Sequence, residues 1–139
     1  MVDRDLVIEK IGQIQRCLKR IQDKTKGDPE SLNDIDIQDI FVLNLQRAVQ
    51  TGIDLAAHIV ADEGLGLPAD LGENFLFLEK AKVIPATLAQ RLRKMVGFRN
   101  IAVHEYAAID PEVLKSILTK DLKDVEEFYS AVFRHFGIS

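Results

Sequence analysis

Apolar residues recur at steps of three and four along most of the chain, which is the spacing of one face of an α-helix. The first helix is predicted to begin after Asp3, whose side chain suits an N-cap, and to end near Gly27. Residues 25–34 combine Gly, Pro, Ser and Asn and are predicted to form a connection. The apolar seam of this helix comprises Val7, Ile11, Ile14, Leu18 and Ile21.

A second, longer helix is predicted from about Asp36 to about Asp62, because its apolar positions keep the helical spacing and no proline interrupts them. Gly52 weakens the centre of this helix, and we expect it to mark close packing against a neighbouring element. The segment EGLGLPADLG, residues 63–72, then ends the pattern with three glycines and a proline.

Further helices are predicted in the second half of the chain. Residues 73–84 form a short one that ends near Pro85, and residues 86–106 form a longer one. Residues 107–109 break the pattern. Asp110 is followed by proline and glutamate, the composition of a helix start, so a last helix is predicted to begin there.

The predicted fold is an all-α, up-and-down bundle of four to five helices, because no segment shows strand periodicity. The length of 139 residues fits one domain with a substantial core, so we assign residues 1–139 to a single domain. The long helices carry apolar residues on more than one face. This predicts that part of their surface is buried in an oligomer.

Composition and charge narrow the class of protein. Hydrophobic residues make up 47% and charged residues 29%, a soluble globular composition in which charges interrupt every candidate membrane span. A signal peptide has a basic segment followed by an apolar one, whereas this N-terminus carries acidic residues. The single cysteine, Cys17, cannot form an internal disulfide. We therefore expect a cytoplasmic protein with no membrane partner. The net charge of −4 argues against a general nucleic-acid binder.

The sequence contains only weak candidates for a metal site or a cofactor site. The sequence GLGLPADLG resembles a phosphate-binding loop, but no strand precedes it. Asp54 and His58 are one helical turn apart, yet such a pair supplies too few ligands for a metal ion. His104 and Glu105 lack the second histidine of a zinc-protease motif, since Ala108 stands there. We expect neither a metal nor a cofactor.

The densest group of polar residues is RNIAVHEY, residues 99–106. A histidine can take or give a proton near neutral pH, and an arginine can bind a phosphate through two N–H groups. Cleavage of an RNA phosphodiester without a metal ion needs this combination, so Arg99 and His104 are the candidate catalytic residues. Asn100 lies one turn before His104 and is predicted to orient its imidazole, and Tyr106 is a candidate contact to phosphate or base.

Helical geometry constrains this hypothesis. In a continuous helix, Arg99 and His104 point about 140° apart around the axis and do not converge on one phosphate. They can meet only if the helix ends between them, or if a two-fold dimer brings His104 of one chain to Arg99 of the other. A structural role, with His104 as a polar residue at a helix end, remains the alternative that the residues alone leave open.

Four residues separate Arg99 from His104, and one residue separates His104 from Tyr106. This spacing resembles the Arg-x4–6-His-x-Tyr motif of the HEPN superfamily. The surrounding sequence VGFRNIAVHEY, followed by a break and by IDPEV, resembles the HepT branch of that superfamily. The resemblance covers nearly the whole chain, including the stretch QRAVQTGIDLAAHI in the second helix.

This resemblance implies a helical HEPN-like homodimer with a composite cleft at its interface. It implies a metal-independent endoribonuclease, the toxin of a toxin–antitoxin pair, with Arg99 and His104 as catalytic residues and Asn100 in a supporting role. The implied antitoxin is a minimal nucleotidyltransferase that silences the toxin by adding AMP to Tyr106. RNA binding would then depend on nearby basic residues, namely Arg91, Arg93 and Lys94 together with Arg99.

A second function remains open at this point. A non-catalytic HEPN-type module would use the same helical dimer to bind a nucleotidyltransferase partner or a nucleotide, with the motif stabilising the interface. The two hypotheses differ in one respect that can be measured: only the first predicts RNA cleavage that depends on His104.

Overall fold

The computed structural model describes residues 2–138, and its first two long helices begin at side-chain N-caps. Helix α1 spans Arg4–Thr25, and the Asp3 side chain accepts a hydrogen bond from the Leu6 amide at its N-terminus. Helix α2 spans Ile35–Asp62, capped by Asp34. The connection predicted between them contains a short 3-10 helix, Pro29–Asn33.

The second half of the chain is also helical. Helix α3 spans Glu73–Lys80 and ends before the predicted limit near Pro85. Helix α4 spans Ala86–His104. The predicted last helix consists of α5, Pro111–Ser116, a π-helical stretch and α6, Leu122–His135. The all-α prediction is confirmed, and within residues 2–138 no helix is long and apolar enough to cross a membrane.

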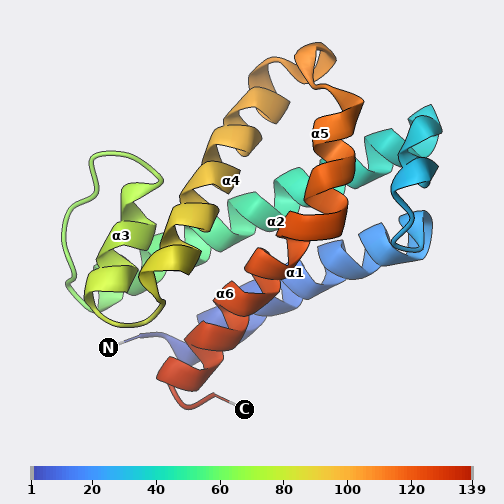
Figure 1. The fold of residues 1–139 in the computed structure, drawn as a ribbon. Coiled ribbons are helices and arrows are strands. Elements are labelled where there is room, and N and C mark those ends of the chain that lie inside the picture. Colours follow the sequence, from blue (N-terminus) through green and yellow to red (C-terminus); the bar gives the residue numbers. More distant parts are fainter. Residues whose placement is uncertain (1, 139) are drawn as a thin grey trace.

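Helix α2 is the central element of the bundle. It packs antiparallel to α1 and also contacts α3, α4 and α6 (Figure 1). Gly52, at the middle of α2, is buried, and a Cβ atom built on it would lie 3.8 Å from the Phe128 ring of α6. The same ring meets Phe75 of α3 edge to face at 5.4 Å between centroids. Gly52 therefore lies against α6 at an ordinary van der Waals distance that leaves room for a Cβ atom.

The apolar seams predicted for the helices form the core. In α1, Val7, Ile11, Ile14 and Ile21 are fully buried, whereas Leu18 is half-buried. Cys17, beside that seam, is also half-buried, and burial raises the pKa of its thiol. This environment suits a structural thiol.

Candidate functional site

The candidate site lies where α4 ends and the chain turns toward α5. The helix continues through His104, and Glu105 leaves it with φ −140° and ψ 47° while its amide donates to the Ile101 carbonyl at 2.7 Å. Tyr106–Ala108 form a 3-10 turn. The prediction of a helix through Tyr106 is wrong by two residues, because the chain already turns at Glu105. Tyr106 thus lies outside the helix that carries Arg99 and His104.

Arg99 and His104 of one chain do not meet. Helix α4 is continuous between them, so their side chains point about 140° apart. Arg99 is half-buried on the side that faces α2, and His104 is exposed. The helix break that would have brought them together does not occur, which leaves a second chain as the remaining route to a joint site.

Arg99 occupies a narrow cleft between α4 and α2, with a volume of about 210 Å³. Two atoms in this cleft, Arg99 Nε and Gln50 Oε1, are buried and have no hydrogen-bond partner among the described residues. Buried polar atoms normally have one, so these two side chains are not fully satisfied within residues 2–138. The lining residues are Gln46, Arg47, Gln50, Thr51 and Arg99.

Asn100 has a different contact from the one predicted. Its side-chain oxygen accepts a hydrogen bond from Arg99 Nη1 at 2.9 Å. The contact that the structure gives this amide is therefore with the guanidinium of the adjacent residue rather than with the imidazole of His104. An amide oxygen that binds the guanidinium limits its rotation and so helps to position Arg99.

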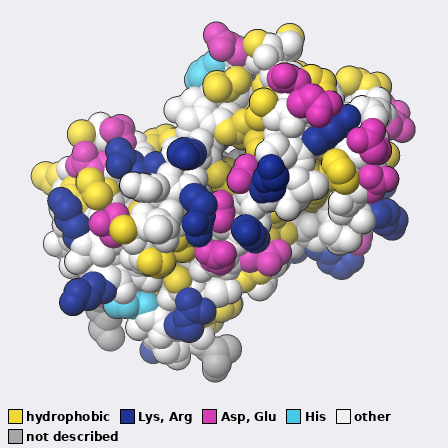
Figure 2. Space-filling model, in the orientation of Figure 1, with side chains coloured by type: hydrophobic (Ala, Val, Ile, Leu, Met, Phe, Trp, Pro, Cys, Tyr) yellow, Lys and Arg dark blue, Asp and Glu magenta, His cyan; other side chains and the backbone are white. Residues whose placement is uncertain are grey.

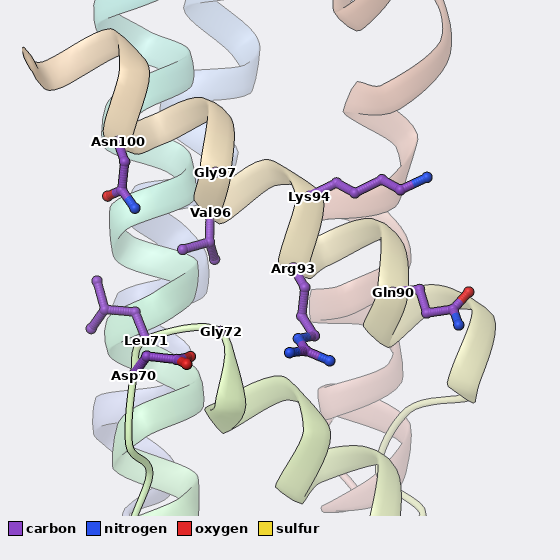
Figure 3. A pocket seen from close by; sticks show the side chains of 9 residues that line it. All are labelled: Asp70, Leu71, Gly72, Gln90, Arg93, Lys94, Val96, Gly97 and Asn100. Carbon is purple, nitrogen blue, oxygen red and sulfur yellow. The ribbon is translucent and has the colours of Figure 1, made fainter.

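A wider cleft of about 840 Å³ lies between α4 and the segment before α3 (Figure 3). Figure 3 shows Arg93 pointing from α4 toward that segment, whereas Lys94 points away from it. The cleft is open beside Gly97, where a Cβ atom built on the glycine would meet nothing within 4 Å. The lining residues are Asp70, Leu71, Gly72, Gln90, Arg93, Lys94, Val96, Gly97 and Asn100.

The basic residues proposed to bind RNA point in different directions from α4, because the helix distributes them around its axis. Lys94 borders one cleft together with Arg91 and another together with Arg93. Arg91 faces α6, where its guanidinium binds the buried carboxylate of Asp124 at 2.9 Å and Glu127 at 3.1 Å. Arg93 and Lys94 are exposed. Figure 2 shows Lys and Arg side chains over α3 and α4 with acidic side chains between them. The charge of Arg91 is thus already compensated within the chain.

Tyr106 makes the longest-range polar contact at the site. Its hydroxyl donates a hydrogen bond to Asp39 Oδ1, which lies in the second turn of α2. Partial burial and the carboxylate of Asp39 together raise the pKa of Tyr106 to about 12. Asp39 could not be singled out from the sequence, because the two residues are 67 positions apart and Asp39 lies in an acidic stretch with several equivalent members.

Asp54 and His58, the pair considered as metal ligands, have other surroundings in the structure. Asp54 accepts a hydrogen bond from Gln50 Nε2 at 3.0 Å, and His58 is exposed on the next turn. Across residues 2–138, no three His, Cys, Asp or Glu side chains lie close enough together to hold a metal ion.

Comparison with known proteins connects this geometry to a family. A family model described as "Ribonuclease HepT-like" matches residues 14–132. The "mRNA nuclease HepT" of Shewanella oneidensis is 37% identical over 128 residues, which cover 92% of this chain and 96% of that protein. The "tRNA nuclease HepT" of Aphanizomenon flos-aquae is 32% identical over 104 residues, covering 75% of this chain and 69% of that protein.

The fold has a solved counterpart at the same level of identity. The structure of the tri-AMPylated Shewanella oneidensis HEPN toxin in complex with its MNT antitoxin superposes with a TM-score of 0.86 at 37% identity. The superposition covers 94% of this chain and 98% of that one. The all-α HEPN-like fold predicted from the sequence is therefore confirmed.

Proposed function

Because this chain belongs to the HepT-like ribonuclease family, we propose that it is an endoribonuclease toxin whose activity is controlled by a nucleotidyltransferase antitoxin. The observation that carries the proposal is the 37% identity to an mRNA nuclease over nearly the full length of both chains. Its substrate is RNA, with mRNA and tRNA as the candidate classes, since two relatives are named for them.

Arg99 and His104 are the proposed catalytic residues. The reaction needs no metal ion: the 2′-hydroxyl loses its proton and attacks the adjacent phosphorus, and the 5′-oxygen leaves with a proton. His104 is exposed and has the chemistry to move one of these protons, and the Arg99 guanidinium stabilises the charge on the phosphorane. The Arg99 guanidinium lies in the cleft beside α2, and its Nη1 donates a hydrogen bond to the Asn100 side chain.

A homodimer is proposed to bring the two residues together. One α4 helix holds Arg99 and His104 apart, so a complete site takes Arg99 from one chain and His104 from the other. Exposed apolar side chains near the site support burial against a second copy. Leu43 follows Asp39 by one turn of α2 and is 45% exposed, and Ile101 and Val103 of α4 are 46% and 39% exposed.

The RNA backbone is proposed to follow one face of α4. Arg93, Gly97, Asn100 and His104 are spaced by four, three and four residues, so they share a face about 16 Å long. Arg93 supplies positive charge at one end and His104 lies at the other. Arg47, which was not among the residues singled out from the sequence, adds a second guanidinium beside Arg99 in the narrow cleft.

We expect Arg93→Ala to weaken RNA binding and to reduce the slope of log affinity against log salt by about 1, because one phosphate contact is lost. Arg91→Ala should leave that slope nearly unchanged and instead lower the free energy of unfolding by about 1–3 kcal/mol, because buried Asp124 loses its partner. Both are measured in a His104→Ala background, which keeps the RNA intact. Equal loss of slope in the two variants would contradict this division of roles.

Tyr106 is the proposed acceptor of AMP. The unmodified chain should cleave RNA in the presence of a chelator, and the chain coexpressed with its cognate nucleotidyltransferase should not. Intact mass should show added adenylyl groups on the coexpressed chain, and Tyr106→Phe should remove them. The physical reason for inhibition is that an added phosphodiester brings negative charge to the site and repels RNA.

The matched control is Tyr129→Phe, because Tyr129 is the other tyrosine of the chain and lies in α6. It should retain the modification. Adenylyl groups that persist in Tyr106→Phe would show that another residue is the acceptor. An unmodified wild-type chain that binds the nucleotidyltransferase but cleaves no RNA would favour the non-catalytic module instead.

A further inference from the structure

The contact between Tyr106 and Asp39 joins two segments that no local constraint brings together. Tyr106 lies in the 3-10 turn after α4, and the backbone of that turn is held by the hydrogen bond from the Ala108 amide to the Glu105 carbonyl at 2.9 Å. From this fixed position the phenol reaches α2, where Asp39 accepts a hydrogen bond from its hydroxyl. Both side chains are also exposed, so an external reagent can approach the hydroxyl oxygen.

Transfer of an adenylyl group to this hydroxyl requires the loss of its proton. With a pKa of about 12, Tyr106 is almost entirely protonated at neutral pH. A neutral phenol is a poor nucleophile, and its activation by a nearby base is the usual solution in group-transfer reactions. The base must lie within hydrogen-bonding distance of the oxygen that attacks.

We propose that Asp39 is the base that accepts the proton of Tyr106 during adenylylation, so that the toxin itself supplies a catalytic residue for its own modification. The inference rests on the proposed function, namely on Tyr106 as the acceptor of AMP. It assigns to α2 a role in the modification reaction in addition to its place in the core.

The atoms of this step balance with ATP as the co-reactant. The Tyr106 oxygen attacks the α-phosphorus of ATP and forms the new oxygen–phosphorus bond. The bond from the α-phosphorus to the bridging oxygen of the β-phosphate breaks, and pyrophosphate leaves. The hydroxyl proton passes to the Asp39 carboxylate, which later returns it to solvent. The antitoxin supplies the bound nucleotide, and this chain supplies nucleophile and base.

The test compares Asp39→Asn with the wild-type chain, using purified toxin, its cognate nucleotidyltransferase and ATP. The asparagine oxygen can still accept the hydrogen bond from Tyr106, so the position of the phenol is retained while the basic group is lost. We expect kcat for adenylylation to fall by about 100-fold or more, with little change in KM for the toxin. Thermal unfolding of Asp39→Asn establishes that the variant is folded.

Asp36→Asn is the matched control, because Asp36 is an exposed aspartate in the first turn of the same helix. It removes the same charge about one turn away and should be modified at the wild-type rate. An equal loss in both variants would mean that charge on α2, rather than the base, supports the reaction, and would overturn the proposal.

The outcomes for the two proposals are distinct. If the wild-type chain receives no AMP at Tyr106, the assignment of Tyr106 as the acceptor fails, and the role of Asp39 fails with it. If the wild-type chain is modified there and Asp39→Asn is modified equally fast, only the role of Asp39 fails. A loss confined to KM would show that Asp39 contributes to recognition by the antitoxin and would also overturn its role as the base.

Discussion

Replacing His104 with alanine should lower the rate of RNA cleavage by about 100- to 10,000-fold, the usual contribution of a positioned acid or base. The loss should appear in kcat, because His104 moves a proton in the transition state and contributes little to holding the RNA. The measurement is single-turnover cleavage of a labelled RNA by unmodified protein. Since His104 is exposed, its replacement should leave the thermal midpoint nearly unchanged.

His58→Ala is the matched control, since His58 is an exposed histidine in a helix that also contacts α4. It should cleave RNA at the wild-type rate. Arg99→Lys complements the pair, because lysine keeps the charge but cannot bind phosphate through two parallel N–H groups, and we expect it to be strongly impaired. Cleavage by His104→Ala at the wild-type rate would refute the proposed mechanism.

Mixing two inactive variants should restore activity if each site draws on both chains. A heterodimer of Arg99→Ala and His104→Ala retains Arg99 on one chain and His104 on the other. In a composite arrangement these two intact residues face each other, and the heterodimer should recover up to about half of the wild-type rate. The geometry that motivates this expectation is the continuous α4 helix, which prevents the two residues of one chain from meeting.

The experiment requires heterodimers purified through two different affinity tags after coexpression. Each variant expressed alone should remain inactive, which provides the baseline. A site built within one chain predicts no recovery, because every chain in the heterodimer then lacks one of the two residues. Full activity of either variant alone would exclude its altered residue from the reaction.

Several features of the fold could be predicted because they depend on neighbours in the chain. The N-caps at Asp3 and Asp110 satisfy backbone amides two or three residues away, so the starts of α1 and α5 follow from short segments. The end of α4 was less predictable, since residues through Tyr106 continue a helical composition.

The contacts of the candidate site were harder to predict from the sequence. The pattern of Arg99, His104 and Tyr106 identified the segment, and helical periodicity showed that the first two diverge. The partners of these residues come from other elements: Arg99 lies against α2, and the Tyr106 hydroxyl binds Asp39. The expected basic patch was also altered by tertiary structure, because Arg91 pairs with Asp124 across the interface of α4 and α6.

The sequence by itself determined the helical class, most helix boundaries and the segment that carries the candidate chemistry. These properties depend on periodicity and capping, which act over a few residues. The tertiary structure decided which side chains meet: the cleft around Arg99, the compensation of Arg91 and the contact between Tyr106 and Asp39. Such contacts form only when elements far apart in the chain pack together, and their geometry depends on the crossing of whole helices rather than on local preference.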